Sequence, residues 1–395
     1  MRKVVEGSTA VAHAIKMCRA QVIAAYPITP QTHIVQELSE MVANGELNAE
    51  YVRVESEHSA ASAVLGASAV GARAYTASSS QGIMLMAEVL FNIAGMRFPV
   101  VMTTANRAIS APINIWNDQQ DSMSVRDSGW IQLYAEDNQE ALDLHLQAYR
   151  IAEDARVQLP VMVCMDGFVL THSYEPVDLP DQEAVDRFLP PYRPTRKLDP
   201  AEPRTFGMYA EEGYTETRYA IQSAMETAKG VIEEVAGDFE RSFGRASGGL
   251  LQTYRTDDAE MVLMGTGSIL GLLKSVVDEL RAEGQKVGAL KLVSFRPFPK
   301  DALARALGHV KKVAVFEKAL SLGGTGIVAA DLRSGLHGYA PFPQVSSFIV
   351  GLGGKDITAG TIRKAVEMAR AGYVDGGFME LDEEFLKDAV LSPES

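Results

Sequence analysis

The N-terminal half of the chain alternates short apolar runs with longer amphipathic segments. The apolar runs are rich in valine, isoleucine and alanine and are typical of parallel strands, at 21–26, 51–54, 74–77, 99–104 and 160–165. Segments with a helical spacing of apolar residues separate them, at 10–20, 32–42, 59–72, 83–94 and 139–154. Strands alternating with helices of this length predict a doubly wound parallel α/β sheet.

The C-terminal half repeats this pattern after a break. Prolines and charges dominate 175–203, which predicts a linker wrapped on the surface, and a helix is expected at 215–243. New strands are predicted at 260–264, 287–293, 313–316 and 344–350, with a helix at 269–282. We therefore expect a first domain over 1–175, with linker and helix to about 255, a second over 256–365, and an acidic tail over 366–395.

Charge and hydropathy narrow the choice of partners. The formal net charge of -14 argues against a nucleic acid or an anionic membrane as the main partner. Neither a targeting signal nor an apolar run long enough to cross a bilayer is recognisable. These features predict a cytoplasmic protein.

Cysteine use argues against a metal centre held by this chain. Cys18 and Cys164 each lie in an apolar segment, and neither belongs to a C-x-x-C pair. We expect two buried, inert thiols and no metal site.

Polar, turn-rich sequence follows several of the predicted strands, at 27–30, 55–59 and 106–107. Functional groups gather at the carboxyl ends of strands in such sheets. The stretch 55–59 places Glu55 and Glu57 at a strand-to-helix turn. Acidic residues there also complement the helix dipole, so a capping role alone is the alternative explanation. The long polar stretch 111–130 holds both tryptophans and predicts a functional loop or an interface.

Other candidate motifs favour structural roles. The turn at 265–267 lacks the third glycine of a dinucleotide fingerprint, so a tight turn without a ligand is expected. His13 and His145 lie in amphipathic helices and are expected to pack or face solvent, whereas His58 and His172 follow strands and stay open. No G-x-S-x-G element supports serine hydrolase chemistry.

Taken in order, five motifs resemble a known family. They are 26–30 (YPITP), 55–59 (ESEHS), 105–108 (ANRA), the tract 110–130 and 296–299 (RPFP). Together they resemble the alpha subunit of 2-oxoacid:ferredoxin oxidoreductases, closest to the four-subunit pyruvate:ferredoxin oxidoreductase type. The resemblance extends from residue 6 to about 361.

The resemblance implies a fold and a division of labour. The N-terminal domain would bind the pyrimidine half of thiamine diphosphate, and the smaller second domain would be transketolase C-terminal-like. Mg²⁺, the diphosphate site and [4Fe-4S] clusters would belong to beta and ferredoxin-like delta subunits, and a gamma subunit would complete the complex. The chain agrees in having neither a G-D-G motif for the diphosphate nor cluster cysteines.

The resemblance also assigns site residues. Glu57 would hydrogen-bond N1′ of the pyrimidine and act as the catalytic acid, with Glu55 as its exposed neighbour. Thr29 and Arg107 would hold the substrate carboxylate, for which a guanidinium fork is well shaped. Pro27, Ile28, Ser80 and Gln81 complete the expected cofactor contacts.

The implied reaction is the coenzyme A-dependent oxidative decarboxylation of pyruvate to acetyl-CoA and CO₂, in anaerobic metabolism, with electrons passed to ferredoxin. A threonine at position 29 suits a monocarboxylic substrate, because oxalate-specific relatives have an arginine there. A sibling enzyme for an aromatic or branched 2-oxoacid such as phenylglyoxylate, with another acceptor, is the first alternative. A non-catalytic scaffold subunit is the second, and it would not need an acid at Glu57.

Overall fold

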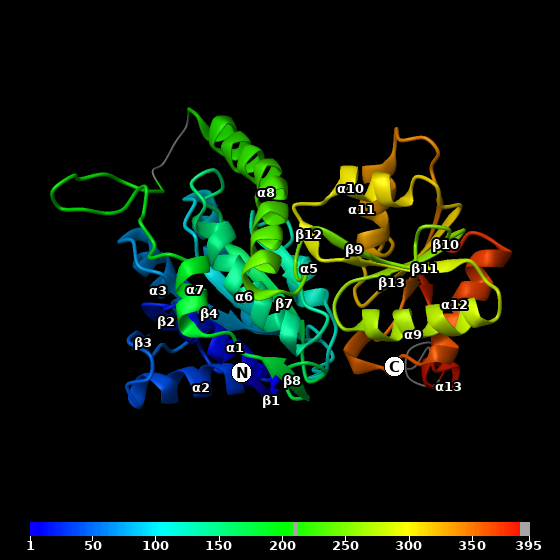
Figure 1. Ribbon diagram of the computed structural model, residues 1–395, viewed down its shortest axis with the longest axis horizontal. Coiled ribbons are helices and arrows are strands. Elements are labelled where there is room, and N and C mark those ends of the chain that lie inside the picture. Colours follow the sequence, from blue (N-terminus) through cyan, green and yellow to red (C-terminus); the bar gives the residue numbers. More distant parts are fainter. Residues whose placement is uncertain (208–211, 388–395) are drawn as a thin grey trace.

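The computed structural model describes residues 1–207 and 212–387, and most of its strands lie in two sheets (Figure 1). The first sheet contains β2 (Val22–Ala24), β3 (Glu50–Val52), β4 (Ala74–Ser78), β5 (Val101–Asn106), β6 (Ile131–Tyr134), β7 (Val161–Asp166) and β12 (Ser294–Arg296). Their order is β12-β6-β7-β5-β4-β2-β3, and every pair is parallel except β12 with β6. We call this sheet and its helices the N-terminal unit.

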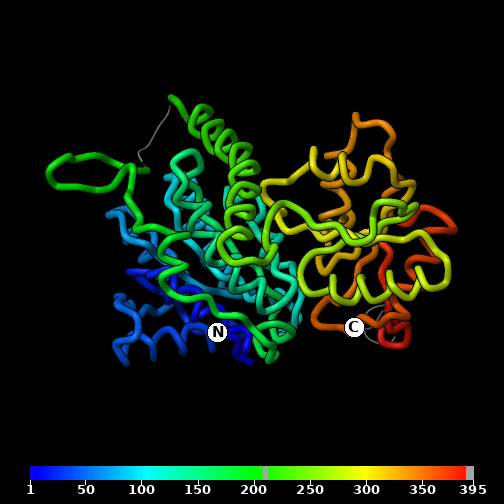
Figure 2. The backbone as a smooth tube through the Cα atoms, in the orientation of Figure 1, coloured from blue at the N-terminus to red at the C-terminus, as the bar shows by residue number. Residues whose placement is uncertain are grey.

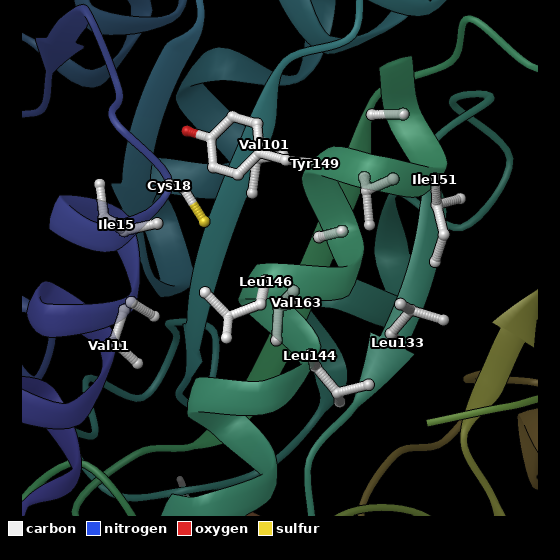
Figure 3. Packing of buried hydrophobic residues seen from close by; sticks show 14 of the residues in the cluster. Val11, Ile15, Cys18, Val101, Leu133, Leu144, Leu146, Tyr149, Ile151 and Val163 are labelled. Atoms are coloured by element: carbon white, nitrogen blue, oxygen red, sulfur yellow. The ribbon is translucent and has the colours of Figure 1, made fainter. Parts of the chain in front are cut away.

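Helices cover both faces of this sheet. One face carries α1 (Gly7–Met17), α2 (Thr32–Ala43) and α6 (Asn138–Glu153), and the long α8 (Tyr214–Phe243) packs on α6. The other carries α3 (Glu57–Ala69) and α4 (Ser80–Gly95). Figure 3 shows side chains of α1 and α6 meeting over the strands, with Val11 and Ile15 near Leu146. The predicted doubly wound α/β sheet is confirmed.

The second sheet forms the C-terminal unit. Its strands are β9 (Leu251–Tyr254), β10 (Met261–Gly265), β11 (Val287–Leu292), β13 (Lys312–Glu317), β14 (Gln344–Ile349) and β15 (Gly377–Phe378). They run in the order β15-β14-β13-β10-β11-β9, parallel except for β9. The helices are α9 (Ile269–Ala282) and α12 (Ala359–Ala371) with one apolar cluster, and α10 (Lys300–Leu307) and α11 (Ile327–Leu336) with another. A short helical turn, η1 (Leu352–Gly354), precedes α12, and another, α13 (Glu383–Phe385), follows β15.

The two units share a strand and a core. After β11 the chain returns to the first sheet, where β12 pairs with β6 in the register Ser294 with Leu133. Buried Trp130 and Tyr134 of the N-terminal unit belong to the same apolar cluster as Leu292 and Phe295. The motif at 296–299 therefore begins at the joint between the units. The domain limits near residues 175 and 255 stay a prediction.

The predicted linker differs from the structure over its first part. It contains β8 (Tyr174–Asp178), which pairs antiparallel with β1 (Arg2–Glu6), and α7 (Gln182–Phe188). Val177 and Phe188 are buried in the main core. The sequence did not indicate β8, because only one of its five residues is buried and its apolar and polar residues do not alternate. The proline-rich residues beyond α7 do project as a long loop (Figure 2).

The predicted acidic tail over 366–395 begins too early. Residues up to Ala371 belong to α12, in which Val366 and Ala369 are buried, and β15 adds an edge strand beside β14. The helical spacing of these apolar residues outweighs the acidic composition that follows. Residues 388–395 of that tail lie outside the described residues. Within the described part of the chain, no helix is both long and apolar enough to cross a membrane.

Candidate active site

The candidate site lies along one edge of the first sheet. Strand order reverses around β2, which has β3 on one side and β4 on the other. In open parallel sheets a crevice forms outside the carboxyl ends of the strands at such a switch point. The segments 27–30, 55–59 and 79–82 follow these three strands, and Arg107 follows β5 next to them.

Glu57 is the first residue of α3 and is buried, with 7% of its surface exposed. Ser56 caps this helix by accepting a hydrogen bond from the Ser59 backbone N–H at 3.1 Å, so neither glutamate is needed as the cap. Within the described chain, the Glu57 carboxyl group has no hydrogen-bond partner. A buried carboxyl group without a partner is costly unless a ligand supplies one.

Gly82, in the first turn of α4, provides the space that the Glu57 side chain fills. A Cβ atom at position 82 would lie 2.7 Å from Glu57 Oε1 and 2.4 Å from Ser78 Oγ. The carboxyl group is therefore held between α3 and the start of α4.

Glu55 has a different environment. Its side chain is exposed and accepts a hydrogen bond from Ser59 Oγ at 2.7 Å, which lowers the pKa of the carboxyl group. The structure thus separates the buried Glu57 from its solvated neighbour.

Arg107 and Thr29 are brought together. Arg107 Nη1 donates to the Thr29 carbonyl oxygen at 3.0 Å and Nε donates to the Asn114 carbonyl oxygen at 2.8 Å. Burial lowers the pKa of Arg107, which is only 6% exposed, and no carboxylate of the described chain forms a salt bridge with it. The Thr29 residue itself is exposed. A buried guanidinium without an anionic partner favours binding of a carboxylate.

Asp121 connects the start of α4 at Ser80 with Arg107, directly after the end of β5. It lies in α5 (Gln120–Ser124), and Oδ2 accepts from the backbone N–H of Ser80 at 2.9 Å and of Arg107 at 3.0 Å. Oδ1 accepts from Asn106 Nδ2 at 2.8 Å and from Ser122 N at 2.7 Å. Burial raises the pKa of Asp121 to about 7, although these donors oppose the shift. The stretch 111–130 is therefore not entirely irregular, because α5 lies within it.

Four further predicted contacts lie on the same edge. Ser80 donates through Oγ to the Ala108 carbonyl, and Gln81 donates through Nε2 to Ser110 Oγ. Both side chains are thus engaged within the chain. Pro27 is exposed and Ile28 is half-buried. The roles of all four as cofactor contacts stay predictions.

Sequence reasoning missed Asp121, Gly82 and Gln31. Gln31 Nε2 donates to the carbonyl oxygens of Tyr26 at 2.7 Å and Ala77 at 3.1 Å, which holds the 27–30 loop against β4. Gly82 directly follows Ser80 and Gln81 in a strand–turn–helix sequence, and that position was the available signal. Nothing in the local sequence indicates the distant partners of Asp121 or Gln31.

The turn at 265–267 lies against the N-terminal unit. A Cβ atom at Gly267 would lie 2.8 Å from Gln119 Nε2 and 3.0 Å from Asp166 Oδ2. Lys318 Nζ donates to Asp166 Oδ2 at 2.8 Å, and Ser268 N donates to the same oxygen at 2.9 Å. Side chains of the chain itself fill this turn, and the absence of a ligand there stays a prediction.

The remaining candidates are placed as follows. His145 is fully buried between Thr103 Oγ1 and the Ala141 carbonyl oxygen, each at 2.6 Å, whereas His58 is exposed. Cys18 and Cys164 are free and buried, and burial raises the pKa of both thiols. The prediction that both thiols are buried is confirmed, and their inertness stays a prediction.

The edge of the sheet fits the pyrimidine half of thiamine diphosphate. An aminopyrimidine has a ring nitrogen that can share a proton with a carboxyl group and an amino group that can donate. On the strands next to Glu57, the buried hydroxyls Ser78 Oγ and Thr104 Oγ1 have no hydrogen-bond partner in the described chain. Unpartnered polar atoms beside a buried carboxyl group match the chemistry of such a ligand.

Comparison with known proteins identifies the family. Residues 13–237 match the family described as pyruvate flavodoxin/ferredoxin oxidoreductase, thiamine diphosphate-binding, and residues 259–362 match pyruvate:ferredoxin oxidoreductase core domain II. A pyruvate synthase subunit PorA from Methanosarcina barkeri is 52% identical, over 97% of each chain. A ketoisovalerate oxidoreductase subunit VorA from Pyrococcus horikoshii is 46% identical, over 93% of each chain.

A solved structure agrees with the fold. The 2-oxoglutarate:ferredoxin oxidoreductase from Magnetococcus marinus superposes with a TM-score of 0.71 at 20% identity, over 93% of this chain and 65% of that chain. The predicted resemblance is confirmed by matches that cover both units. The chain belongs to the pyruvate flavodoxin/ferredoxin oxidoreductase family, and its N-terminal unit carries the family's thiamine diphosphate-binding region.

Proposed function

We propose that this chain is the alpha subunit of a pyruvate synthase, which oxidatively decarboxylates pyruvate with coenzyme A and passes the electrons to ferredoxin. The observation that carries the proposal is the buried Glu57 carboxyl group, which has no partner in the described chain, at the switch point of the first sheet. The 52% identity to a pyruvate synthase subunit over 97% of the chain supports the substrate.

Glu57 is the residue to which we assign acid–base work. When bound, thiamine diphosphate supplies a carbon nucleophile that attacks the 2-oxo carbon and accepts its electrons on decarboxylation. The Glu57 carboxyl group would share a proton with N1′ of the aminopyrimidine ring. Its position between α3 and the start of α4 fixes the carboxyl group in place and limits its contact with solvent.

Arg107 and Thr29 are the residues to which we assign the carboxylate of pyruvate. Two bonds to backbone carbonyl oxygens, of Thr29 and Asn114, hold the Arg107 guanidinium in one orientation. Within the described chain Nη2 donates no hydrogen bond, which leaves it available to a ligand. The exposed Thr29 hydroxyl would add a neutral hydrogen bond.

The rest of the active site would come from partner chains. The diphosphate and its Mg²⁺ would be bound by a beta subunit, and [4Fe-4S] clusters by the beta and ferredoxin-like delta subunits, with a gamma subunit completing the complex. Both cysteines of this chain are buried within its cores, which agrees with clusters held elsewhere. The subunit composition and the cytoplasmic location are part of the proposal.

A branched 2-oxoacid is the second candidate substrate. The ketoisovalerate oxidoreductase subunit, at 46% identity, is nearly as similar as the pyruvate synthase subunits. The complex assembled with its partner chains should be assayed with pyruvate, ketoisovalerate and phenylglyoxylate. A higher kcat/KM for ketoisovalerate would replace pyruvate as the substrate without altering the roles of Glu57 and Arg107.

The test of the proposal compares the two neighbouring glutamates in the assembled complex. Glu57→Gln should lower turnover by about a hundredfold to ten-thousandfold, because the proton shared with N1′ is lost at nearly constant shape. Glu55→Gln is the matched control and should stay within a few-fold of the parent enzyme. Equal losses in the two variants, or full activity of Glu57→Gln, would refute the assignment and favour a scaffold subunit.

A further inference from the structure

Three side chains that can bind metal ions meet outside the candidate active site. Glu6 ends β1, His33 lies in the first turn of α2, and His172 follows β7 in the chain. One potential ligand atom from each lies within 4.8 Å of the others. His33 Nδ1 is 2.7 Å from Glu6 Oε1, and the rings of His33 and His172 are 4.6 Å apart between centroids.

We infer that Glu6, His33 and His172 form a binding site for a divalent transition-metal ion of the zinc class. Two imidazoles and one carboxylate are a donor set that zinc and iron(II) use in open sites, in which water completes the coordination. The three residues come from separate segments, so a bound ion would join the β1–β8 ribbon to the start of α2.

The three ligand atoms would have to move slightly to bind one ion. With bonds of about 2.0–2.1 Å, two ligand atoms on a tetrahedral zinc ion lie roughly 3.3–3.5 Å apart. The widest present spacing, up to 4.8 Å, must therefore close by about 1.5 Å, and the 2.7 Å between His33 Nδ1 and Glu6 Oε1 must open by about 0.7 Å. The His33 side chain is 47% exposed and can turn toward the ion, whereas the Glu6 side chain is 12% exposed and provides a fixed anchor.

His172 has a hydrogen-bond partner at the ring nitrogen that would not bind the metal ion, as histidine ligands usually do. Its Nδ1 lies 2.7 Å from Thr171 Oγ1, which also accepts a hydrogen bond from the Phe168 backbone N–H at 2.8 Å. If Nδ1 carries the proton and donates to Thr171, Nε2 has a free lone pair for the ion. Thr171 is fully buried, so this orientation is firmly held.

An ion pair between His33 and Glu6 is the simpler explanation, and it accounts for two of the residues. The His172 ring also packs on the Phe168 ring, at 4.7 Å between centroids, so stacking without a metal ion is the alternative that the titration below must exclude.

The site also lies next to the loop that carries Thr29. His33 follows Pro30 closely in the chain, and a Cβ atom at Gly167 would lie 2.7 Å from Pro30 Cγ. A metal ion joining His33 to His172 would tie the start of α2, next to this loop, to the segment that follows β7. The ion would thus stabilise the unit without taking part in the reaction.

The experiment uses the full chain after treatment with a chelator. Co²⁺ and Zn²⁺ are titrated, with the visible spectrum of Co²⁺ and the melting temperature as readouts. We expect about one ion per chain with a tetrahedral-type Co²⁺ spectrum and a rise in Tm on adding Zn²⁺. His33→Gln and His172→Gln should each abolish both signals, and Thr171→Val should weaken binding about tenfold to a hundredfold.

His337→Gln is the matched control, because His337 is exposed in the C-terminal unit, away from the three ligands. It should bind Co²⁺ as the parent chain does. The metal-free Tm of each variant separates loss of binding from loss of folding, and the half-exposed His33 is the safer substitution. Absence of Co²⁺ binding by the parent chain, or binding that survives both histidine substitutions, would overturn the inference.

Discussion

At the scale of single residues, the site depends on where one helix begins. Helix α3 starts at Glu57, so that side chain points inward between two helices, while Glu55 stays in solvent two residues earlier. Gly82 has no side chain and therefore leaves room for the Glu57 carboxyl group. Small residues near the site thus act through the space that they leave free.

Gly82→Ala should disturb Glu57 without unfolding the chain. The new methyl group would overlap Glu57 Oε1 and Ser78 Oγ, and a displacement of about an ångström at a reacting group costs on the order of a hundredfold in rate. Turnover of the assembled complex and its affinity for thiamine diphosphate are the measurements. Gly95→Ala, in the same helix with open space around it, is the control and should keep full activity.

Substitutions of Arg107 and Thr29 should raise KM for the 2-oxoacid. Arg107→Lys keeps the charge but loses the fork that bonds to the Thr29 and Asn114 carbonyls, so KM should rise about tenfold to a hundredfold. Thr29→Val removes one neutral hydrogen bond and should have a smaller effect, on the order of 1 kcal/mol. KM for coenzyme A should not change in either variant.

The double variant tests whether the two residues act together. Two groups that bind one carboxylate are energetically coupled. The double variant should therefore lose less binding free energy for the 2-oxoacid, measured through KM, than the two single variants lose together. Strict additivity, or a normal KM in Arg107→Lys, would mean that the carboxylate binds elsewhere.

At the scale of elements, α5 connects parts of the site that are far apart in sequence. A helix of five residues is not stable by itself, so tertiary bonds must hold it in place. The Asp121 carboxylate provides them by accepting from Ser80, Asn106 and Arg107. Strand β5 and helix α4 are thereby fixed relative to each other.

Asp121 should make stability depend on pH. Because burial raises its pKa in the folded state from 3.8 to about 7, the folded state binds the extra proton in this range. Its contribution to stability is therefore complete below pH 4 and is lost as the pH rises to about 7, with a limiting slope of about 1.4 kcal/mol per pH unit. Denaturant unfolding between pH 4.5 and 8 would measure it.

Asp121→Asn is the variant that isolates this contribution. It should flatten the pH dependence of the unfolding free energy over that range. It should also lower the unfolding free energy by about 1–3 kcal/mol, because an amide N–H₂ would face backbone donors. An unchanged pH profile would mean that another group titrates.

At the scale of the whole molecule, the two units behave as one body. They share strand β12 and an apolar cluster, and a buried ion pair between Asp166 and Lys318 lies at the joint. Burial opposes ionisation of Asp166, but Lys318, Ser268 and Gln119 outweigh it and lower the pKa of the carboxyl group. The carboxyl ends of both sheets therefore meet at this joint.

Lys318→Met should destabilise the whole chain. Removing one partner of a buried pair leaves Asp166 without its counter-charge, which costs about 3–5 kcal/mol. Because the core is shared, denaturant unfolding should remain a single transition. Lys16→Met, which removes an exposed pair with Glu46, is the control and should leave stability almost unchanged, because solvent screens the pair. Two separated transitions in the parent chain would contradict a shared core.

The sequence by itself determined the α/β class, most strands and helices, the family and the three strand ends that carry the candidate residues. The helix predicted at 269–282 coincides with α9, because its apolar spacing is a local property. The family motifs are local as well, so Glu57, Thr29 and Arg107 could be named from the chain alone. Their catalytic and binding roles stay predictions.

The tertiary structure alone decided which residues support that site. Several features of the folded protein join segments that are far apart in the chain. They are strands β8 and β12, the partners of Asp121, the pair of Asp166 with Lys318, and the contact of His33 with His172. A short strand or a single polar side chain has no period and no local partner, so nothing near it in the sequence reveals its role. Its energy comes from burial and from hydrogen bonds that exist only after the chain has folded.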